Sequence, residues 1–220
     1  MSRSSLQEER SAQTRRRLLD AAVACLSERG YTRTTTTEIA ERAGVSRGAQ
    51  VHHFRHKEEL VLGALDHICE RRLAELRYAF EELPMGAMEF RLETLLDLIW
   101  VAFRGPSFYA WLELLVASRT DPILRGAVRE TNRRLSSGIR HAFAKFLDDG
   151  FTPPERAEKV ARVVEIAFGK LESMALERAL LESHEPDPPD LLRSLEELKQ
   201  TAREILGSRD ESRLGSRGAI

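Results

Sequence analysis

Apolar residues recur at helical spacing along most of the chain, and the alternating pattern typical of strands is almost absent. In residues 12–28, for example, the apolar positions fall on one face of a helix. Glycine and proline separate one such segment from the next. The pattern predicts an all-α protein with nine helices. They are expected as two short helices between residues 34 and 54, and at residues 12–28, 57–83, 87–103, 107–118, 122–147, 153–182 and 188–206.

Two of the later helices have explicit start signals. Asp121 is a suitable N-cap, and Pro122 follows it at the first helical position. Thr152 and Glu155 have the spacing of a capping box, in which two side chains satisfy backbone N–H groups at a helix start. These signals place the beginnings of the seventh and eighth helices.

The most informative motif in the chain is a short helix, a tight turn and a second short helix. Ile39, Ala40 and Ala43 give the first of these helices an apolar face. Gly44 permits the backbone conformation of a sharp turn, and Ser46 is a suitable N-cap for the second helix. This is the pattern of a helix-turn-helix, whose second helix enters the major groove of DNA.

A more detailed match extends over residues 18–65. The matching positions are Gly30, Tyr31, Thr34, Thr35, Ile39, Ala40, Ala43, Gly44, Val45, Ser46, Gly48, His53, Phe54, Lys57 and Glu58. In their order and spacing these residues resemble the TetR family of transcriptional regulators. The resemblance implies a three-helix DNA-binding domain followed by a helical domain that binds a ligand and forms a homodimer.

The order of the helices, three short and then six longer, agrees with that architecture. We therefore expect a helix-turn-helix domain at residues 1–56 and a ligand-binding and dimerisation domain at residues 57–206. The fourth helix belongs partly to each domain and can transmit motion between them. Residues 207–220 are rich in Ser, Gly and Arg and are expected to be a disordered tail.

The distribution of charge is consistent with DNA binding in the first part of the chain. The net charge of the whole chain is −1. Residues 1–62 hold 11 Lys and Arg against 8 Asp and Glu, whereas residues 63–220 hold 23 against 27. Basic side chains are therefore in excess only where the helix-turn-helix lies, which is where they could face phosphates.

The cysteines and the N-terminus favour a cytoplasmic protein. Cys25 and Cys69 are the only cysteines, and both fall in helical patterns, so we expect two reduced thiols rather than a disulfide. Residues 1–17 carry charges but no apolar run, so they do not have the pattern of a signal peptide. No segment is apolar enough to span a membrane, and no membrane partner is expected.

Phosphate contacts are expected at the start of each helix of the motif. Thr35 and Thr36 are candidates, because hydroxyls and free backbone N–H groups at a helix start bind phosphate. The alternative is that these threonines only cap the helix. Ser46 caps the second helix and can share a phosphate, and the resemblance assigns Lys57 to a backbone contact.

Base contacts are expected from the second helix of the motif. Arg47 can pair in bidentate fashion with guanine O6 and N7, and Gln50 with adenine N6 and N7. Gly48 and Ala49 allow a close approach, and the Ala49 methyl group can touch a thymine methyl. The alternatives for Gln50 are a capping role or simple exposure to solvent.

The chain departs from the family pattern next to these residues. Relatives often have Leu-Tyr-Tyr or Leu-Tyr-Trp where this chain has Gln50, Val51 and His52. The tyrosine phosphate contact therefore cannot be transferred to Val51, and His52 is expected to take one instead. His52, His53 and His56 do not predict a metal site, because adjacent histidines on a helix point apart and no acidic or Cys partner is evident. No metal or other cofactor is expected.

The last two helices carry wide apolar stripes. A four-helix bundle built from these helices of two chains would bury both stripes. The alternative is that they are ordinary buried helices of a monomer. The predicted dimer interface comprises Val164, Phe168, Leu171, Ala175, Leu191, Leu195, Leu198 and Ala202.

Five aromatic residues cluster on either side of Gly105 and Pro106. They can be core residues, but the family places its ligand pocket among these middle helices, and pockets are mostly apolar with a few polar groups. The predicted ligand contacts are Trp100, Phe103, Arg104, Phe108 and Trp111, with Glu113 as an alternative polar group. The expected effector is a small, largely apolar molecule.

The sequence leaves two other classes of function to consider. An all-helical enzyme is disfavoured, because no nucleophile-elbow, zinc-protease or phosphate-loop motif is found. A DNA-binding protein without an effector, whose second half only forms a dimer or docks a partner, stays open. The predicted function is a homodimeric repressor that binds a palindromic operator in double-stranded DNA and is released by its effector.

Overall fold

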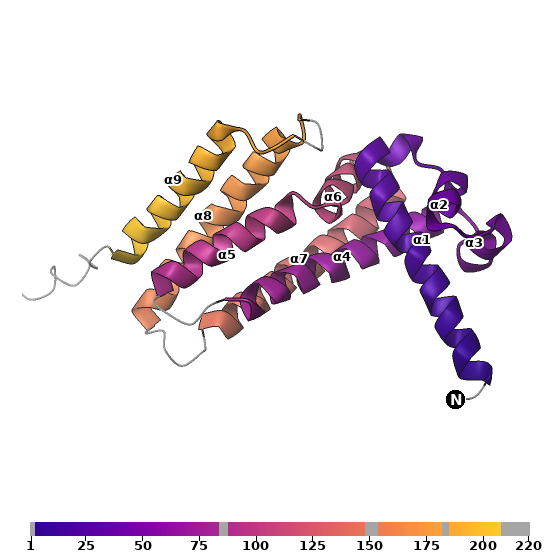
Figure 1. The fold of residues 1–220 in the computed structure, drawn as a ribbon, viewed down its shortest axis with the longest axis horizontal. Coiled ribbons are helices and arrows are strands. Elements are labelled where there is room, and N and C mark those ends of the chain that lie inside the picture. Colours follow the sequence, from indigo (N-terminus) through magenta and orange to yellow (C-terminus); the bar gives the residue numbers. More distant parts are fainter. Residues whose placement is uncertain (1–2, 84–87, 148–153, 182–184, 208–220) are drawn as a thin grey trace, which may run out of the picture. The chain divides into compact units, whose positions relative to one another are not determined.

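The computed structural model describes residues 3–83, 88–147, 154–181 and 185–207 (Figure 1). Within these ranges the chain forms nine α-helices and no strand, as the all-α prediction required. The helices are α1 (Arg3–Arg33), α2 (Thr36–Ala43), α3 (Arg47–His53), α4 (Lys57–Glu81), α5 (Met88–Phe103), α6 (Pro106–Ala117), α7 (Pro122–Leu147), α8 (Pro154–Arg178) and α9 (Pro189–Gly207). None of these helices combines the length and apolar composition that crossing a bilayer requires.

Helix α1 begins earlier than the apolar pattern predicted. Residues 6–13 of this helix are exposed and bury no apolar stripe, so periodicity does not detect them. They consist largely of Leu, Gln, Glu and Arg, which are good helix formers. The predicted stop lies in the right place, because Gly30 has φ 76° and ψ 169° and interrupts the helical backbone before Tyr31.

The start signal of α7 is confirmed. Asp121 Oδ1 accepts hydrogen bonds from the backbone N–H groups of Ile123, at 2.9 Å, and Leu124, at 3.1 Å. The capping box at Thr152 and the tail beyond residue 207 lie outside the described residues. Helix α8 ends at Arg178, a turn before the predicted residue 182.

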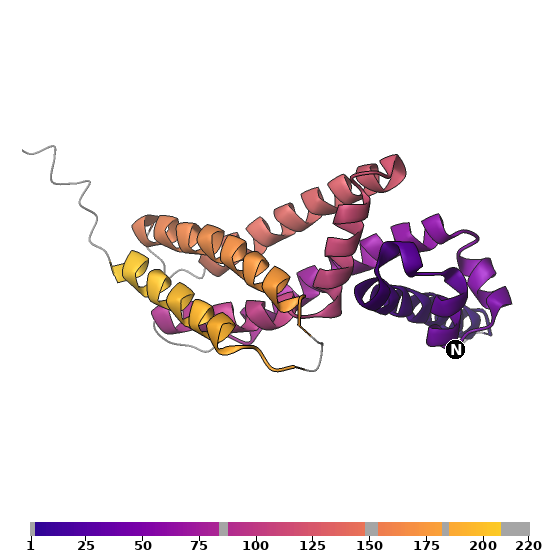
Figure 2. The same cartoon turned by 90° about the horizontal axis from the view of Figure 1, so that it is seen from above.

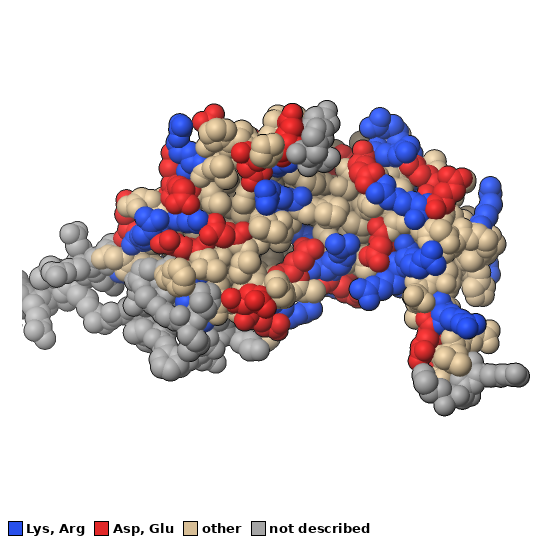
Figure 3. All heavy atoms as spheres, in the orientation of Figure 1, with Lys and Arg blue, Asp and Glu red and all other residues tan. Residues whose placement is uncertain are grey.

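The chain folds into two compact units. One consists of Met1–Glu81 with Val101–Ala142, and the other of Glu82–Trp100 with Phe143–Ile220. This grouping follows packing rather than the predicted boundary after residue 56, because α4 packs against α1 and α6 within the first unit (Figure 2). The division into a DNA-binding and a ligand-binding domain stays a prediction. Basic and acidic side chains are interspersed over the face shown in Figure 3.

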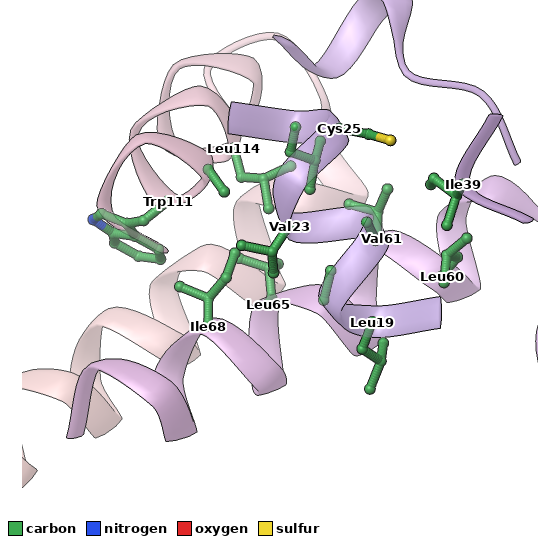
Figure 4. Packing of buried hydrophobic residues seen from close by; sticks show 14 of the residues in the cluster. Leu19, Val23, Cys25, Ile39, Leu60, Val61, Leu65, Ile68, Trp111 and Leu114 are labelled. Carbon is green, nitrogen blue, oxygen red and sulfur yellow. The ribbon is translucent and has the colours of Figure 1, made fainter. Parts of the chain in front are cut away.

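The core of the first unit joins the helix-turn-helix to α6. Figure 4 shows Trp111 and Leu114 of α6 close to Val23 of α1, with Ile68 of α4 beside them. The same cluster includes Ile39 of α2, which is fully buried. Because α6 and the motif share one close-packed core, a displacement of α6 should also displace α1.

Within the second unit, α8 packs against α9, and ionic contacts join α9 to α5. Lys199 Nζ lies 2.7 Å from Asp97 Oδ1. A more buried set of hydrogen bonds fixes the segment that precedes α9. Arg178 Nε donates to Asp187 Oδ1 at 3.0 Å, and Trp100 Nε1 donates to Asp187 Oδ2 at the same distance. Arg178 Nη2 also donates to the Glu185 carbonyl, at 2.6 Å.

Candidate nucleic-acid interface

The turn between α2 and α3 has the geometry of a helix-turn-helix. Thr35 Oγ1 caps α2 by accepting a hydrogen bond from the Glu38 N–H at 3.2 Å. Gly44 has φ 61° and ψ 40°, a left-handed conformation that favours glycine. The Gly44 and Val45 N–H groups then bond to carbonyls at the end of α2, and the half-buried Val45 packs on the core. These contacts fix the angle at which α3 leaves the turn.

Helix α3 presents one face to solvent. Ser46 Oγ accepts a hydrogen bond from the Ala49 N–H at 3.2 Å and caps the helix, as predicted. Arg47, Gly48 and His52 are exposed, and Val51 is 44% exposed. An exposed helix with a basic residue in its first turn is the element that a major groove can accept.

Gln50 does not lie on this face. Its side chain is 2% exposed, and Nε2 donates to the Phe54 carbonyl at 2.6 Å. The amide therefore supplies a hydrogen bond to the carbonyl of Phe54, the residue that caps the C-terminal end of α3. This role resembles the capping role that was the alternative for Gln50. This geometry does not favour the predicted contact of Gln50 with adenine, because the amide would have to leave a buried bond. Ala49 is half-buried beside it.

The threonines at the start of α2 have different roles. Thr34, which the contact prediction did not include, is buried, and its Oγ1 donates to the Gly30 carbonyl at 2.7 Å. Thr35 is exposed and caps α2, so its hydroxyl hydrogen stays available to a phosphate oxygen. Thr36 is half-buried. Phosphate contacts by Thr35 and Thr36 stay predictions.

Lys57 has a partner that the sequence did not indicate. Its Nζ donates to the Tyr31 carbonyl at 2.7 Å and lies 4.6 Å from the centre of the Tyr31 ring. Burial lowers the pKa of Lys57. An ammonium group has three N–H donors, so the bond to Tyr31 leaves donors for a phosphate. The predicted backbone contact thus remains compatible with the structure.

Tyr31 connects the motif to two other helices. Its N–H donates to Glu113 Oε2 of α6 at 3.2 Å, and its hydroxyl donates to Asp121 Oδ2 at the start of α7 at 3.3 Å. Burial, with the Asp121 carboxylate nearby, raises the pKa of Tyr31. The Gly-Tyr pair in the motif was the only sequence signal for this junction.

An open hollow of about 660 Å³ lies beside the junction. Its lining consists of Tyr31, Thr32, Ala117, Thr120, Asp121, Pro122 and Ile123. None of these residues belongs to the predicted ligand contacts.

The predicted ligand residues are divided between the two units. Phe103 and Phe108 are buried in the first unit with ring centres 5.0 Å apart, and Trp111 belongs to its core. Arg104, also in the first unit, is exposed. Trp100 lies in the second unit and donates to Asp187.

Two charged residues of α4 lie beside the phenylalanines and were not predicted. The Arg72 guanidinium is 5.3 Å from the centre of the Phe103 ring and 5.2 Å from that of Phe108. Ser107 Oγ donates to Glu75 Oε1 at 3.5 Å, and burial raises the pKa of Glu75. Long-range packing, which no local pattern reports, brings these groups together.

Most of the predicted dimer residues are buried within a single chain. Leu171, Ala175, Leu191, Leu195, Leu198 and Ala202 are at most 6% exposed, and Val164 and Phe168 are half-buried. This burial favours the alternative that the stripes pack inside the monomer. Other residues form the exposed face of α8. Ile166 and Leu176 are 40% and 47% exposed, and the spacing of Ile166, Gly169, Ser173 and Leu176 keeps them on one face.

Within the described residues no group of three His, Cys, Asp or Glu side chains is arranged to hold a metal ion. Cys25 and Cys69 are buried free cysteines.

Known proteins match this architecture in both sequence and fold. Residues 18–64 match the family described as bacterial regulatory proteins, tetR family. The HTH-type transcriptional regulator CymR of Pseudomonas putida is 34% identical over 128 residues, which are 58% of this chain and 62% of CymR. The HTH-type transcriptional regulator BetI of Escherichia coli strain UMN026 is 30% identical over 135 residues, which are 60% of this chain and 69% of BetI.

The fold is also similar to that of solved structures. A TetR-family transcriptional regulator from Mesorhizobium loti superposes with a TM-score of 0.68 over 89% of this chain and 98% of that one, at 20% identity. The alignment with CymR spans less than two thirds of that protein.

Proposed function

The chain belongs to the TetR family of bacterial regulatory proteins, and we propose that it acts as a homodimeric repressor controlled by a small effector. As a family member it is a DNA-binding transcriptional regulator and not an enzyme. The palindromic operator, the dimer, the effector and a cytoplasmic site of action are parts of the proposal.

The observation that carries the proposal is the exposed face of α3. Ser46 fixes the start of the helix, and Arg47 projects from its first turn into solvent. We assign Arg47 to a guanine, with Gly48 and Ala49 allowing the backbone to approach the base edges. Thr35, Thr36, Ser46, His52 and Lys57 are assigned to phosphates, which set the register of the helix in the groove.

The exposed stripe of α8 supports the homodimer. Its apolar and small residues would bury against the same stripe of a second chain, with Leu192 of α9, which is 49% exposed, at the edge. The predicted residues Leu171 and Leu195 would then support this contact from beneath. A two-fold dimer reads two half-sites one helical turn apart, about 34 Å.

Effector control is proposed to act through α6. A largely apolar molecule would bind beside Phe103, Phe108 and Trp111, with Arg72 and Arg104 as polar partners. A shift of α6 would then displace Tyr31 through its bond to Glu113. The displaced Tyr31 would in turn move Lys57, whose ammonium group is bonded to the Tyr31 carbonyl. The ligand and DNA must weaken each other's binding by the same factor.

Selection of DNA from a random duplex pool tests the function directly. A homodimeric helix-turn-helix protein should enrich an inverted repeat with half-sites about one helical turn apart. Enrichment of a single half-site would contradict the homodimer. Failure to enrich any sequence would contradict the regulator that reads an operator.

A further inference from the structure

The N-terminal half of α1 contacts both ends of α3, the helix assigned to the major groove, through two arginines. Arg17 Nη2 donates to the Gly44 carbonyl, in the turn before α3, at 3.1 Å. The Arg15 guanidinium lies 5.3 Å from the centre of the ring of Phe54, which caps the other end of α3. These contacts place this stretch of α1 alongside the surface assigned to DNA.

One face of this stretch carries two arginines and no acidic residue. Leu6, Arg10, Gln13 and Arg17 are spaced four, three and four residues apart, so they lie on one side of the helix. All four are exposed. Because Arg17 reaches the turn, this face is on the helix-turn-helix side. We call these four residues the Arg10–Arg17 face.

The Arg10–Arg17 face continues beyond the motif. Seven residues of helix rise about 10 Å, so Arg10 lies two turns further out than Arg17. Figure 1 shows the N-terminal half of α1 extending past α2 and α3. Residues 7–13 are all exposed, so this segment gains no stability from burial in the core. The Arg10 side chain is therefore accessible to a partner.

We propose that the Arg10–Arg17 face binds phosphates of the DNA that flanks the half-site read by α3. This inference rests on the proposed function, and it extends the DNA contact to a part of the chain outside the helix-turn-helix. Phosphates line both edges of the major groove, and a guanidinium binds them in bidentate fashion. Arg17, beside the turn, faces the edge of the groove, and Arg10 reaches the next phosphates along the strand.

The test compares Arg10→Ala with Arg16→Ala. Both side chains are exposed, carry the same charge and lie on the same helix. Arg16 lies on another face, about 120° around the axis, and alanine preserves the helix in both variants. The measurement is DNA affinity as a function of salt, on a long duplex and on one trimmed to the half-sites.

Arg10→Ala should lower the slope of log K against log salt by about 0.9 for each phosphate lost, whereas Arg16→Ala should leave it unchanged. Trimming the flanks should weaken the wild-type protein and Arg16→Ala but not Arg10→Ala. Equal slopes for the two variants would overturn the proposal, as would an Arg10→Ala protein that stays sensitive to trimming.

Repeating the titrations with a duplex of scrambled sequence separates this inference from the proposed function. Phosphate contacts form on any duplex, so the difference between the variants should persist there. A wild-type protein with no preference between the two sequences would contradict operator binding, while the slopes still decide whether the Arg10–Arg17 face contacts phosphates.

Discussion

The Tyr31 carbonyl oxygen holds the Lys57 ammonium group at 2.7 Å, at the point where α4 begins. The same tyrosine is bonded to α6 through Glu113 and to the start of α7 through Asp121. One residue therefore positions a cation assigned to DNA and contacts α6, the helix through which the effector is proposed to act. This arrangement is the route by which we propose that effector binding reaches the phosphate contact.

Replacing Lys57 with alanine should weaken binding to all DNA sequences alike. The loss of one phosphate contact per subunit should lower the salt slope by about 0.9 for each subunit. The lost bond to Tyr31 should also reduce the free energy of unfolding by about 1 kcal/mol. Titrations of specific and scrambled duplexes at several salt concentrations measure the first effect. A change confined to one base pair would contradict the phosphate assignment.

Glu75 should make the stability of the first unit depend on pH. Burial raises its pKa above the ordinary 4.5, so the folded state favours the neutral acid. Its stabilising contribution is complete below pH 4.5 and is lost as the pH rises through the folded-state pKa. The free energy of unfolding of the wild-type protein, relative to Glu75→Gln, should therefore fall with rising pH. Urea unfolding between about pH 4 and 8 measures it, and a pH-independent difference would refute the effect.

Leu176→Glu should produce folded monomers. The side chain is 47% exposed on α8, so a charge there costs little within the chain but disrupts the proposed interface. Ile123→Glu is the control, since Ile123 is 63% exposed in the other unit and should leave the dimer intact. Sedimentation gives the mass. A Leu176→Glu protein that remains dimeric would rule out the stripe as the interface.

Asp187→Ala should destabilise the second unit by about 3–5 kcal/mol, because it leaves the Arg178 charge buried without its carboxylate. Asp190→Ala is the control. Its carboxylate is 90% exposed and pairs with an exposed Arg193, so the loss should stay below about 1 kcal/mol. Denaturant unfolding, followed by tryptophan fluorescence, measures both. Similar losses for the two variants would show that the buried pair adds no stability.

Local signals in the sequence predicted local structure well. Ser46 and Asp121 cap their helices as expected, because an N-cap depends on residues two or three positions away. The apolar pattern found the buried faces of α1, α2, α8 and α9. It did not find the first turns of α1, since a helix that buries nothing leaves no periodic signal.

Contacts between distant residues could not be predicted from such signals. Lys57 and Tyr31 are 26 positions apart, and only the packing of α4 on α1 brings them together. Periodicity showed that Leu171 and Leu195 are buried, but it carries no information on whether the partner is the same chain or a second one. The amide of Gln50 could bind a base or a carbonyl, and its bond to the Phe54 carbonyl depends on the path of the backbone there, which local patterns do not report.

The central claim is that α3 reads a DNA sequence through Arg47. The most direct measurement is the affinity of the wild-type protein and of Arg47→Ala for the selected operator and for each of its single-base variants. Arg47→Ala should lose about 1–3 kcal/mol of specific binding and should no longer discriminate at one base pair of each half-site, while discrimination elsewhere is retained. An Arg47→Ala protein with an unchanged profile of sequence preference would contradict the account.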